Sequence, residues 1–411
     1  MTGRPRHPPG LVAVVAALAT AAPAAAQRPP VHVAATAVAA VTRMDPAPGG
    51  DARTDFALDL TTLMARAALA GGRVTLAATV SLEGATIPGG VLTPGAVGEG
   101  FVDRRHPHTY LHEMVATVRQ PLDERGTGEL AVTVGKGFVA FGSDDPMNRP
   151  VLRYPVNHHW AQVLERAVVI AGARRGAVSL EASLFNGDEP ERPWQAPNLS
   201  RFGDSWALRG TVRVGSLLEL QASHAQVVSP EHRGGAGPRA AKWSGSARLD
   251  RPLRAGRVYG LVEWARTVEG GFFRFDALLL ESELRLGPHR PYYRFERTER
   301  PEEERTADPF RTRRPPTDDA ILGITRWTVH TLGFAVRLPA VRGLRVEPMV
   351  EVARAGVAAV GPGLFRPEVF YGSDVIWSLT LGIRLAAGQP HRMGRYGVLD
   401  ADPGSERHEG H

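Results

Sequence analysis

Residues 344–352, LRVEPMVEV, decide the fold because their side chains alternate between two chemical kinds. Successive side chains of a β-strand point to opposite faces of the sheet. One face of this stretch is apolar and the other is charged: Leu344, Val346, Val350 and Val352 stand against Arg345, Glu347 and Glu351. The pattern predicts a strand between an apolar environment and a polar one.

The same alternation recurs along the chain. It is found at 73–83 (RVTLAATVSLE), 129–136 (ELAVTVGK), 178–185 (VSLEASLF), 293–298 (YRFERT) and 377–385 (WSLTLGIRL). Connectors rich in Gly, Pro and charge separate such segments. We expect about 14 to 16 strands, with 16 the favoured number, which is typical of a transmembrane β-barrel.

The N-terminus has the layout of a secretory signal peptide. Arg4 and Arg6 precede a short apolar stretch at 11–19, and small residues at 24–26 form a cleavage site. We therefore expect residues 1–26 to be removed on export, residues 27–398 to form one barrel domain, and residues 399–411 to be a disordered tail.

The overall composition excludes several classes of protein. The chain has no cysteine, so neither disulfides nor thiolate metal sites stabilise it. Its formal net charge of +6 is spread over 411 residues, which is not the dense basic patch that nucleic-acid binding requires. No apolar run after the N-terminal segment reaches the ~18 residues of a transmembrane helix.

Alternation alone would also fit a soluble β-sandwich. Export, the number of similar strands, the lack of disulfides and the charged face together favour an all-β, antiparallel, up-and-down β-barrel in the outer membrane. Aromatic residues near the expected strand ends would form its interfacial girdles, although in a soluble fold they would be core. They are Tyr110, Trp160, Trp206, Trp264, Tyr292, Trp327 and Trp377.

Residues 134–167, VGKGFVAFGSDDPMNRPVLRYPVNHHWAQVLERA, and 184–191, LFNGDEPE, carry a resemblance to a known family. They resemble Gram-negative outer-membrane porins of the phosphate-selective-porin-like group over residues 130–215, with one strand ending at Phe141-Gly142 and the next opening at Leu164-Glu165-Arg166. The resemblance implies a diffusion channel that is monomeric or a homotrimer.

The chain departs from this family in two respects. It has no lysine cluster, so phosphate specificity is not carried over. It also continues past the last clear strand, where Tyr396 would close a short final strand ahead of the tail.

We expect a porin-like channel for passive diffusion of small polar or charged solutes, in contact with outer-membrane lipid and lipopolysaccharide, with neither enzymatic activity nor a cofactor. The strand alternation predicts charged side chains on the inner face, where they would bias ion selectivity. The predicted pore-lining residues are Glu219, Gln221, Glu281, Glu283, Arg294, Glu296, Arg345, Glu347 and Arg384.

The stretch 101–115, FVDRRHPHTYLHEMV, supports an alternative function. His106, His108 and His112 are nitrogen donors of the kind that zinc prefers, and alternate histidines on a strand provide two ligands on one face. A closed barrel that binds a divalent metal is therefore an alternative, and an outer-membrane hydrolase is another.

The densest block of charge is 294–316, RFERTERPEEERTADPFRTRRPP. It fits a solvated outer loop. It also fits a loop folded into the lumen, with Glu302, Glu303 and Glu304 facing barrel arginines and narrowing the pore.

Overall fold

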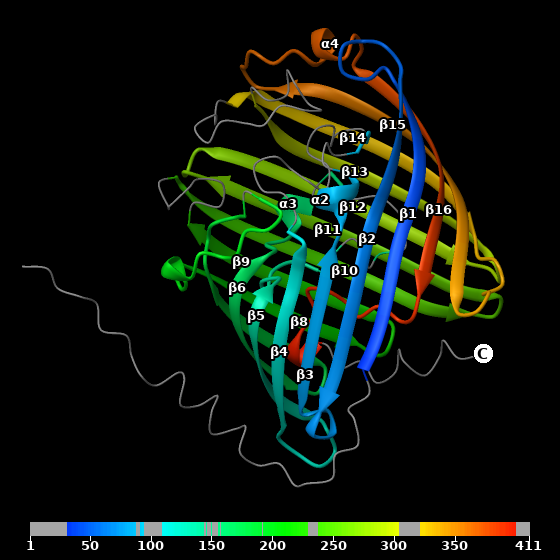
Figure 1. The fold of residues 1–411 in the computed structure, drawn as a ribbon. Helices are drawn as coiled ribbons and strands as arrows, with labels where there is room; N and C mark the ends of the chain where they lie inside the picture. Colours follow the sequence, from blue (N-terminus) through cyan, green and yellow to red (C-terminus); the bar gives the residue numbers. More distant parts are fainter. Residues whose placement is uncertain are drawn as a thin grey trace, which may run out of the picture.

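The alternating segments pair into a closed ring of sixteen strands, each antiparallel to its neighbours (Figure 1). The computed structural model describes residues 31–399, with gaps at 88–90, 94–108, 144, 146–148, 150–154, 157, 191, 229–236 and 304–320. The strands are β1 (Val31–Asp45), β2 (Arg53–Leu69), β3 (Val74–Ser81), β4 (Leu111–Pro121), β5 (Gly128–Gly137), β6 (Arg166–Arg175), β7 (Val178–Phe185), β8 (Ser205–Val214), β9 (Leu218–Val228), β10 (Arg239–Leu253), β11 (Gly256–Glu269), β12 (Phe273–Arg285), β13 (His289–Glu303), β14 (Ile321–Val336), β15 (Leu344–Val360) and β16 (Val375–Ala387).

The ring closes between its first and last strands. Thr42 of β1 lies opposite Thr380 of β16, and their hydroxyl oxygens are 3.0 Å apart. Closure gives every described strand two partners, which a sheet in lipid needs because hydrocarbon offers no hydrogen-bonding groups to a free edge. The predicted up-and-down barrel of 16 strands is confirmed.

The two faces of the sheet differ as the alternation predicts. In β16, Leu381 is 58 % exposed on the outer surface, whereas its neighbour Thr380 is 2 % exposed on the inner one. In β15, Val352 is 41 % exposed and Glu351 is 2 % exposed. The outer surface is therefore apolar around the ring, which suits contact with hydrocarbon, and the inner surface is polar.

The two ends of the barrel also differ. Where β1 starts and β16 ends, the strands are joined by short turns such as 176–177 and 254–255. At the opposite end the connections include the long segments 82–110 and 138–165. Outer-membrane barrels have short periplasmic turns and longer outer loops, so the short-turn end corresponds to the periplasmic side of such a barrel and the long-loop end to its outer side.

The helical elements are short. They are α2 (Glu83–Thr86), α3 (His158–Ala161), α4 (Pro367–Phe370) and the 3-10 turns η1 (Ala70–Gly72), η3 (Leu199–Arg201) and η6 (Gly397–Leu399). Within the described ranges, no helix has the length and apolarity required to cross a membrane.

The aromatic side chains expected at the membrane boundary divide between the two faces. Trp206, Trp264 and Trp377 are exposed on the outer surface. Trp160, Tyr292 and Trp327 are buried, so the girdle interpretation is wrong for them. Tyr110 immediately precedes β4. Alternation explains the difference for Tyr292 and Trp327, because both occupy inward positions of their strands.

Several expected boundaries shift. β5 ends at Gly137, so Phe141-Gly142 lies beyond the strand that it was expected to end. Tyr396 belongs to no strand. Glu302 lies in β13, and residues 304–316 of the charged block fall outside the described residues. The predicted signal peptide and all but Leu399 of the predicted tail are also outside them, and Leu399 is buried in η6.

The apolar outer face makes a prediction about stability. Replacing Leu381 by Arg should lower the free energy of unfolding by roughly 2–4 kcal/mol in lipid vesicles, because the charge would face hydrocarbon near mid-strand. The matched control is Val341→Arg, an exposed apolar position in the turn between β14 and β15, with an expected cost of about 0–1 kcal/mol. Equal costs in urea titrations would contradict the assignment of the outer face.

Candidate functional site: the barrel interior

The inner wall formed by β11, β12 and β13 is charged and closely paired. Arg294 donates from Nε and Nη2 to Glu281 Oε1, at 2.9 and 2.7 Å. Glu263 accepts from Arg149 Nη2 at 3.1 Å and from Ser143 Oγ at 2.5 Å. All of these side chains are buried. Buried charges are tolerated only when they are paired and hydrogen-bonded, so these contacts stabilise the wall as a set.

Arg149 and Ser143 belong to the connection between β5 and β6, which folds into the barrel. Its Ala140 amide donates to Ser183 Oγ of β7 at 3.0 Å, and its Gly142 amide donates to Ser223 Oγ of β9 at 2.9 Å. Gly142 has a φ of +70°, and a Cβ there would collide with the Ala161 carbonyl oxygen. Glycine at this position therefore allows the segment to turn across the inner wall.

The same segment reaches β12 and β13 further along. The Trp160 ring in α3 stacks on Phe275 with 4.8 Å between ring centroids, and its Nε1 donates to the Glu299 carbonyl at 2.8 Å. The Val156 amide donates to Glu296 Oε2 at 2.6 Å. For the charged block 294–316 the sequence left open a solvated outer loop or a loop folded into the lumen, and residues 304–316 lie outside the described residues. The described residues of the segment 138–165 lie inside the barrel.

Two other segments enter the lumen. The start of the β3–β4 connection places Ile87 and Val91 in an apolar cluster with Val38, Tyr292 and Met349 of the walls. Residues 388–399, here called the C-terminal strap, leave β16 and run inside the barrel.

The strap is held by charged side chains of the far wall. Arg395 donates from Nη1 and Nη2 to the two carboxylate oxygens of Glu219, at 2.7 and 2.6 Å. Tyr396 Oη donates to Glu113 Oε2 at 2.5 Å, and His391 contacts the other oxygen of Glu113. Burial raises the pKa of the Tyr396 hydroxyl well above its usual value, and the nearby Glu113 carboxylate adds to this, so the hydroxyl keeps its proton and remains a donor.

Arginines outnumber carboxylates on the inner wall near the short-turn end of β12 to β16. Glu347 accepts from Arg337 Nε at 2.9 Å and also pairs with Arg290. Glu283 accepts from Arg290 Nη2 at 2.6 Å and from Arg285 Nε at 2.5 Å. The oxygens of both glutamates are thus already engaged by three arginines.

Arg384 adds to this excess of positive charge. It lies opposite Glu347 in the register of β15 and β16, and its Nη2 has no hydrogen-bond partner among the described residues. Arg345, two residues before Glu347, donates to the Gly388 carbonyl at 2.6 Å rather than to a carboxylate. Both arginines are partly exposed.

The predicted pore-lining residues all take inward positions of their strands. Buried among them are Gln221, Glu281, Glu283, Arg294, Glu296 and Glu347, while Glu219, Arg345 and Arg384 are partly exposed. That a permeating solute contacts these residues stays a prediction.

His112 lies in the inner wall of the barrel. Its Nδ1 is 2.5 Å from Glu165 Oε1, and its Nε2 is 3.8 Å from Asp145 Oδ2. His106 and His108 lie outside the described residues, and within the described ranges no three His, Asp or Glu side chains are grouped to hold a metal ion. The zinc site therefore stays a prediction. His112 itself is engaged in carboxylate contacts.

Glu83, in α2 beside this cluster, is fully buried. It accepts a hydrogen bond from the Leu60 amide at 3.0 Å. Burial raises the pKa of its carboxyl from 4.5 to about 8, with the His112 charge acting in the opposite direction. Glu83 therefore holds a proton at neutral pH, which removes one charge from the interior.

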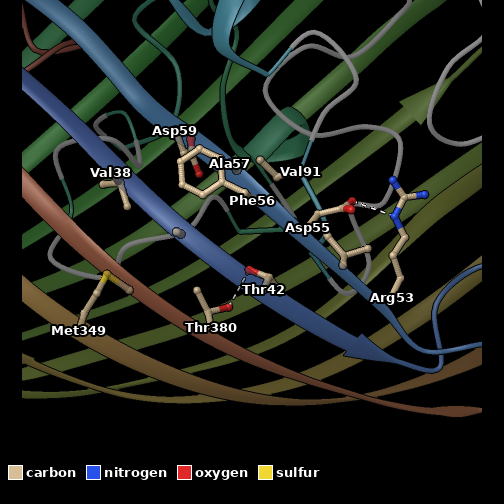
Figure 2. Close-up of a pocket in the computed structure, with 12 residues that line it drawn as sticks. Val38, Thr42, Arg53, Asp55, Phe56, Ala57, Asp59, Val91, Met349 and Thr380 are labelled. Carbon is tan, nitrogen blue, oxygen red and sulfur yellow. Dashed lines mark hydrogen bonds and ion pairs between the residues drawn. The ribbon is translucent and has the colours of Figure 1, made fainter.

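A pocket of about 250 Å³ remains along β1 and β2 (Figure 2). Its wall includes Thr42, Thr380 and Asp59 beside Met349 and Val38. Figure 2 shows these side chains coming from adjacent strands. The pocket thus combines polar and apolar walls next to the segment that carries Val91.

Sequence reasoning missed the interior residues that lie outside the strands. Arg149 and Arg395 sit in connecting or terminal segments with no period of two, and Tyr396 lies inside the barrel and not in the short final strand expected for it. Strand alternation also gave no indication of Glu113, because a register shift in β3 and β4 turns both His112 and Glu113 inward.

The barrel is similar to solved outer-membrane proteins over most of its length. An anion-selective porin from Comamonas acidovorans is 11% identical, with a TM-score of 0.51 over 87% of this chain and 99% of that one. The chain has the porin fold. A loop-deletion mutant of OmpT, an outer membrane protein of Vibrio cholerae, is 10% identical, with a TM-score of 0.50 over 87% of this chain and 99% of that one.

These likenesses confirm the resemblance to outer-membrane porins in fold and extend it beyond residues 130–215. The narrower phosphate-selective-porin-like group stays an expectation. No family model and no curated protein sequence matches the chain.

The buried Glu83 predicts a dependence of stability on pH. Since its pKa is higher in the folded barrel than in the unfolded chain, its contribution is fully present below pH 4.5 and is lost as the pH rises through about 8. Glu83→Gln should therefore flatten the fall in the free energy of unfolding over this window, measured in urea at several pH values. Parallel pH profiles for the two proteins would show that Glu83 does not titrate in this way.

Proposed function

We propose that the chain is an outer-membrane channel through which small polar and charged solutes diffuse passively. The observation that carries the proposal is the contrast between the two faces of a closed porin-fold barrel, apolar outside and charged inside. A charged wall in a lipid-spanning barrel serves solutes that cannot cross hydrocarbon, because it replaces part of their hydration. No metal and no covalent step is required.

The path for solutes is narrow. The described residues of segments 82–93, 138–165 and 388–399 contact inner walls. Many charged side chains of the wall are buried beneath these segments. The pocket along β1 and β2 marks space that these segments leave free. The channel should therefore discriminate by size and conduct less than a barrel with an unobstructed lumen of the same strand number.

The charge of the inner wall favours anions. Around the two carboxylates of Glu283 and Glu347 the wall carries five arginines, which are Arg285, Arg290, Arg337, Arg345 and Arg384. Fixed guanidinium groups concentrate anions at a pore and repel cations. Small carboxylates and inorganic anions are thus the solute class we propose, with the barrel surrounded by lipid and lipopolysaccharide as a monomer or a homotrimer.

Ion selectivity tests the proposal. Refolded wild-type protein in a planar bilayer should give discrete conductance steps and a reversal potential on the anion side in a salt gradient. Arg384→Gln should shift the reversal potential towards cations, because it removes one guanidinium from the arginine-rich part of the inner wall. The matched control is Arg354→Gln, which removes the same charge from the outer face beside Trp377.

An unchanged reversal potential in Arg384→Gln would remove this residue from the path. Folded protein that never gives conductance steps would reject the channel itself.

A further inference from the structure

The C-terminal strap is an internal segment with its own route through the lumen. It begins at Gly388, where φ is +68° and a Cβ would lie 3.0 Å from Ala34 Cα of β1. Only glycine adopts this conformation at so close an approach without strain, and the turn directs the chain inward at the short-turn end. The strap then passes to the wall formed by β4 to β9, far from β16 in the ring (Figure 1).

The wall binds both the side chains and the backbone of the strap. In addition to the pairs made by Arg395 and Tyr396, Arg209 Nη1 donates to the Gly394 carbonyl at 3.2 Å. Arg119 Nε donates to the Gly397 carbonyl, also at 3.2 Å. The strap is therefore recognised by groups on several strands and is not merely tethered to β16.

Apolar side chains complete the contact. Met393 and Tyr396 belong to a buried cluster with Phe138 and Val115. Val398 is fully buried, and its Cγ2 would lie 2.9 Å from a Cβ placed on Gly172 of β6. With valine at 398, a side chain at 172 would displace the strap, so glycine at 172 leaves room for it.

The strap nevertheless takes no part in the strand ladders. Outside the strands, two backbone hydrogen bonds involve this segment: Asp145 N donates to Met393 O at 3.4 Å, and Leu399 N donates to Tyr396 O at 3.1 Å. The β1–β16 closure is complete without it. Release of the strap would therefore leave the pairing of the sixteen strands unbroken, so the segment can separate as one unit while the barrel stays closed.

We propose that the C-terminal strap is a gate: docked on the β4–β9 wall it restricts the lumen, and its release opens a wider path. The proposal rests on the channel function proposed above. Glu113 and Glu219 are the docking carboxylates, and Tyr396 and Arg395 are the groups that leave them. The opening equilibrium is set by these contacts together with the burial of Met393 and Val398.

A disulfide tests the gate directly, because the chain contains no cysteine of its own. In Gly172→Cys/Val398→Cys the Val398 methyl groups that would crowd a Cβ at 172 are gone, and the closeness of the two positions allows a disulfide that would lock the docked strap. Oxidised protein should conduct less than the same protein after reduction. The single variant Val398→Cys should not respond to the redox treatment.

A full-length release variant tests the opposite direction. Arg395→Ala/Tyr396→Ala removes the bidentate ion pair and the buried hydroxyl, so the opening equilibrium should shift by about tenfold or more. Mean conductance should rise, and a maleimide should label Val398→Cys faster by a similar factor when the release substitutions are added. Labelling reports release of the strap whether or not the barrel conducts.

The outcomes separate the two proposals. Equal conductance in oxidised, reduced and release forms would overturn the gate and leave the channel intact. Labelling of Val398→Cys no faster than global unfolding of the barrel would also overturn the gate. Absence of conductance in every form, including the release variant, would overturn the channel and the gate with it.

Discussion

The structure depends on the pairing of charges inside a closed sheet. A carboxylate or guanidinium buried in the barrel has lost its water, so it must be offset by an opposite charge on a neighbouring strand or on a segment inside. Glu281 and Arg294 do this between adjacent strands, whereas Glu263 is paired through Arg149 from the β5–β6 connection. The inner charges therefore hold the inward segments in place, and the wall and its contents stabilise each other.

The fold was readable from the sequence because a period of two reports which face a side chain occupies. Leu381 and Thr380 needed no further information, and neither did Glu347 or Glu351. The number of such segments gave the strand count. The end of β5 was expected too late in the chain, because Phe141 and Gly142 continue an apolar run. The chain uses this run for an inward turn after β5 has ended.

The interior was only partly readable. Alternation placed Arg294 and Glu296 correctly on the inner face, but it carries no information on which loop enters the lumen. Arg149 and Arg395 lie in segments without periodicity, and their carboxylate partners are far away in sequence. His112 shows a second limit: a register shift between β3 and β4 turns two consecutive residues inward, which strict alternation forbids. Long-range pairing and local irregularity are properties of the folded chain.

In the proposed channel, inward segments, and not the ring of strands, set the size of the path. Uptake by liposomes that contain the wild-type protein, measured with neutral sugars and polyethylene glycols of increasing size, tests this most directly. The predicted result is entry of the smallest solutes, with a sharp cutoff well below the size that a sixteen-strand barrel without inward segments would admit. Free passage of large polymers, or exclusion of even the smallest sugars, would contradict it.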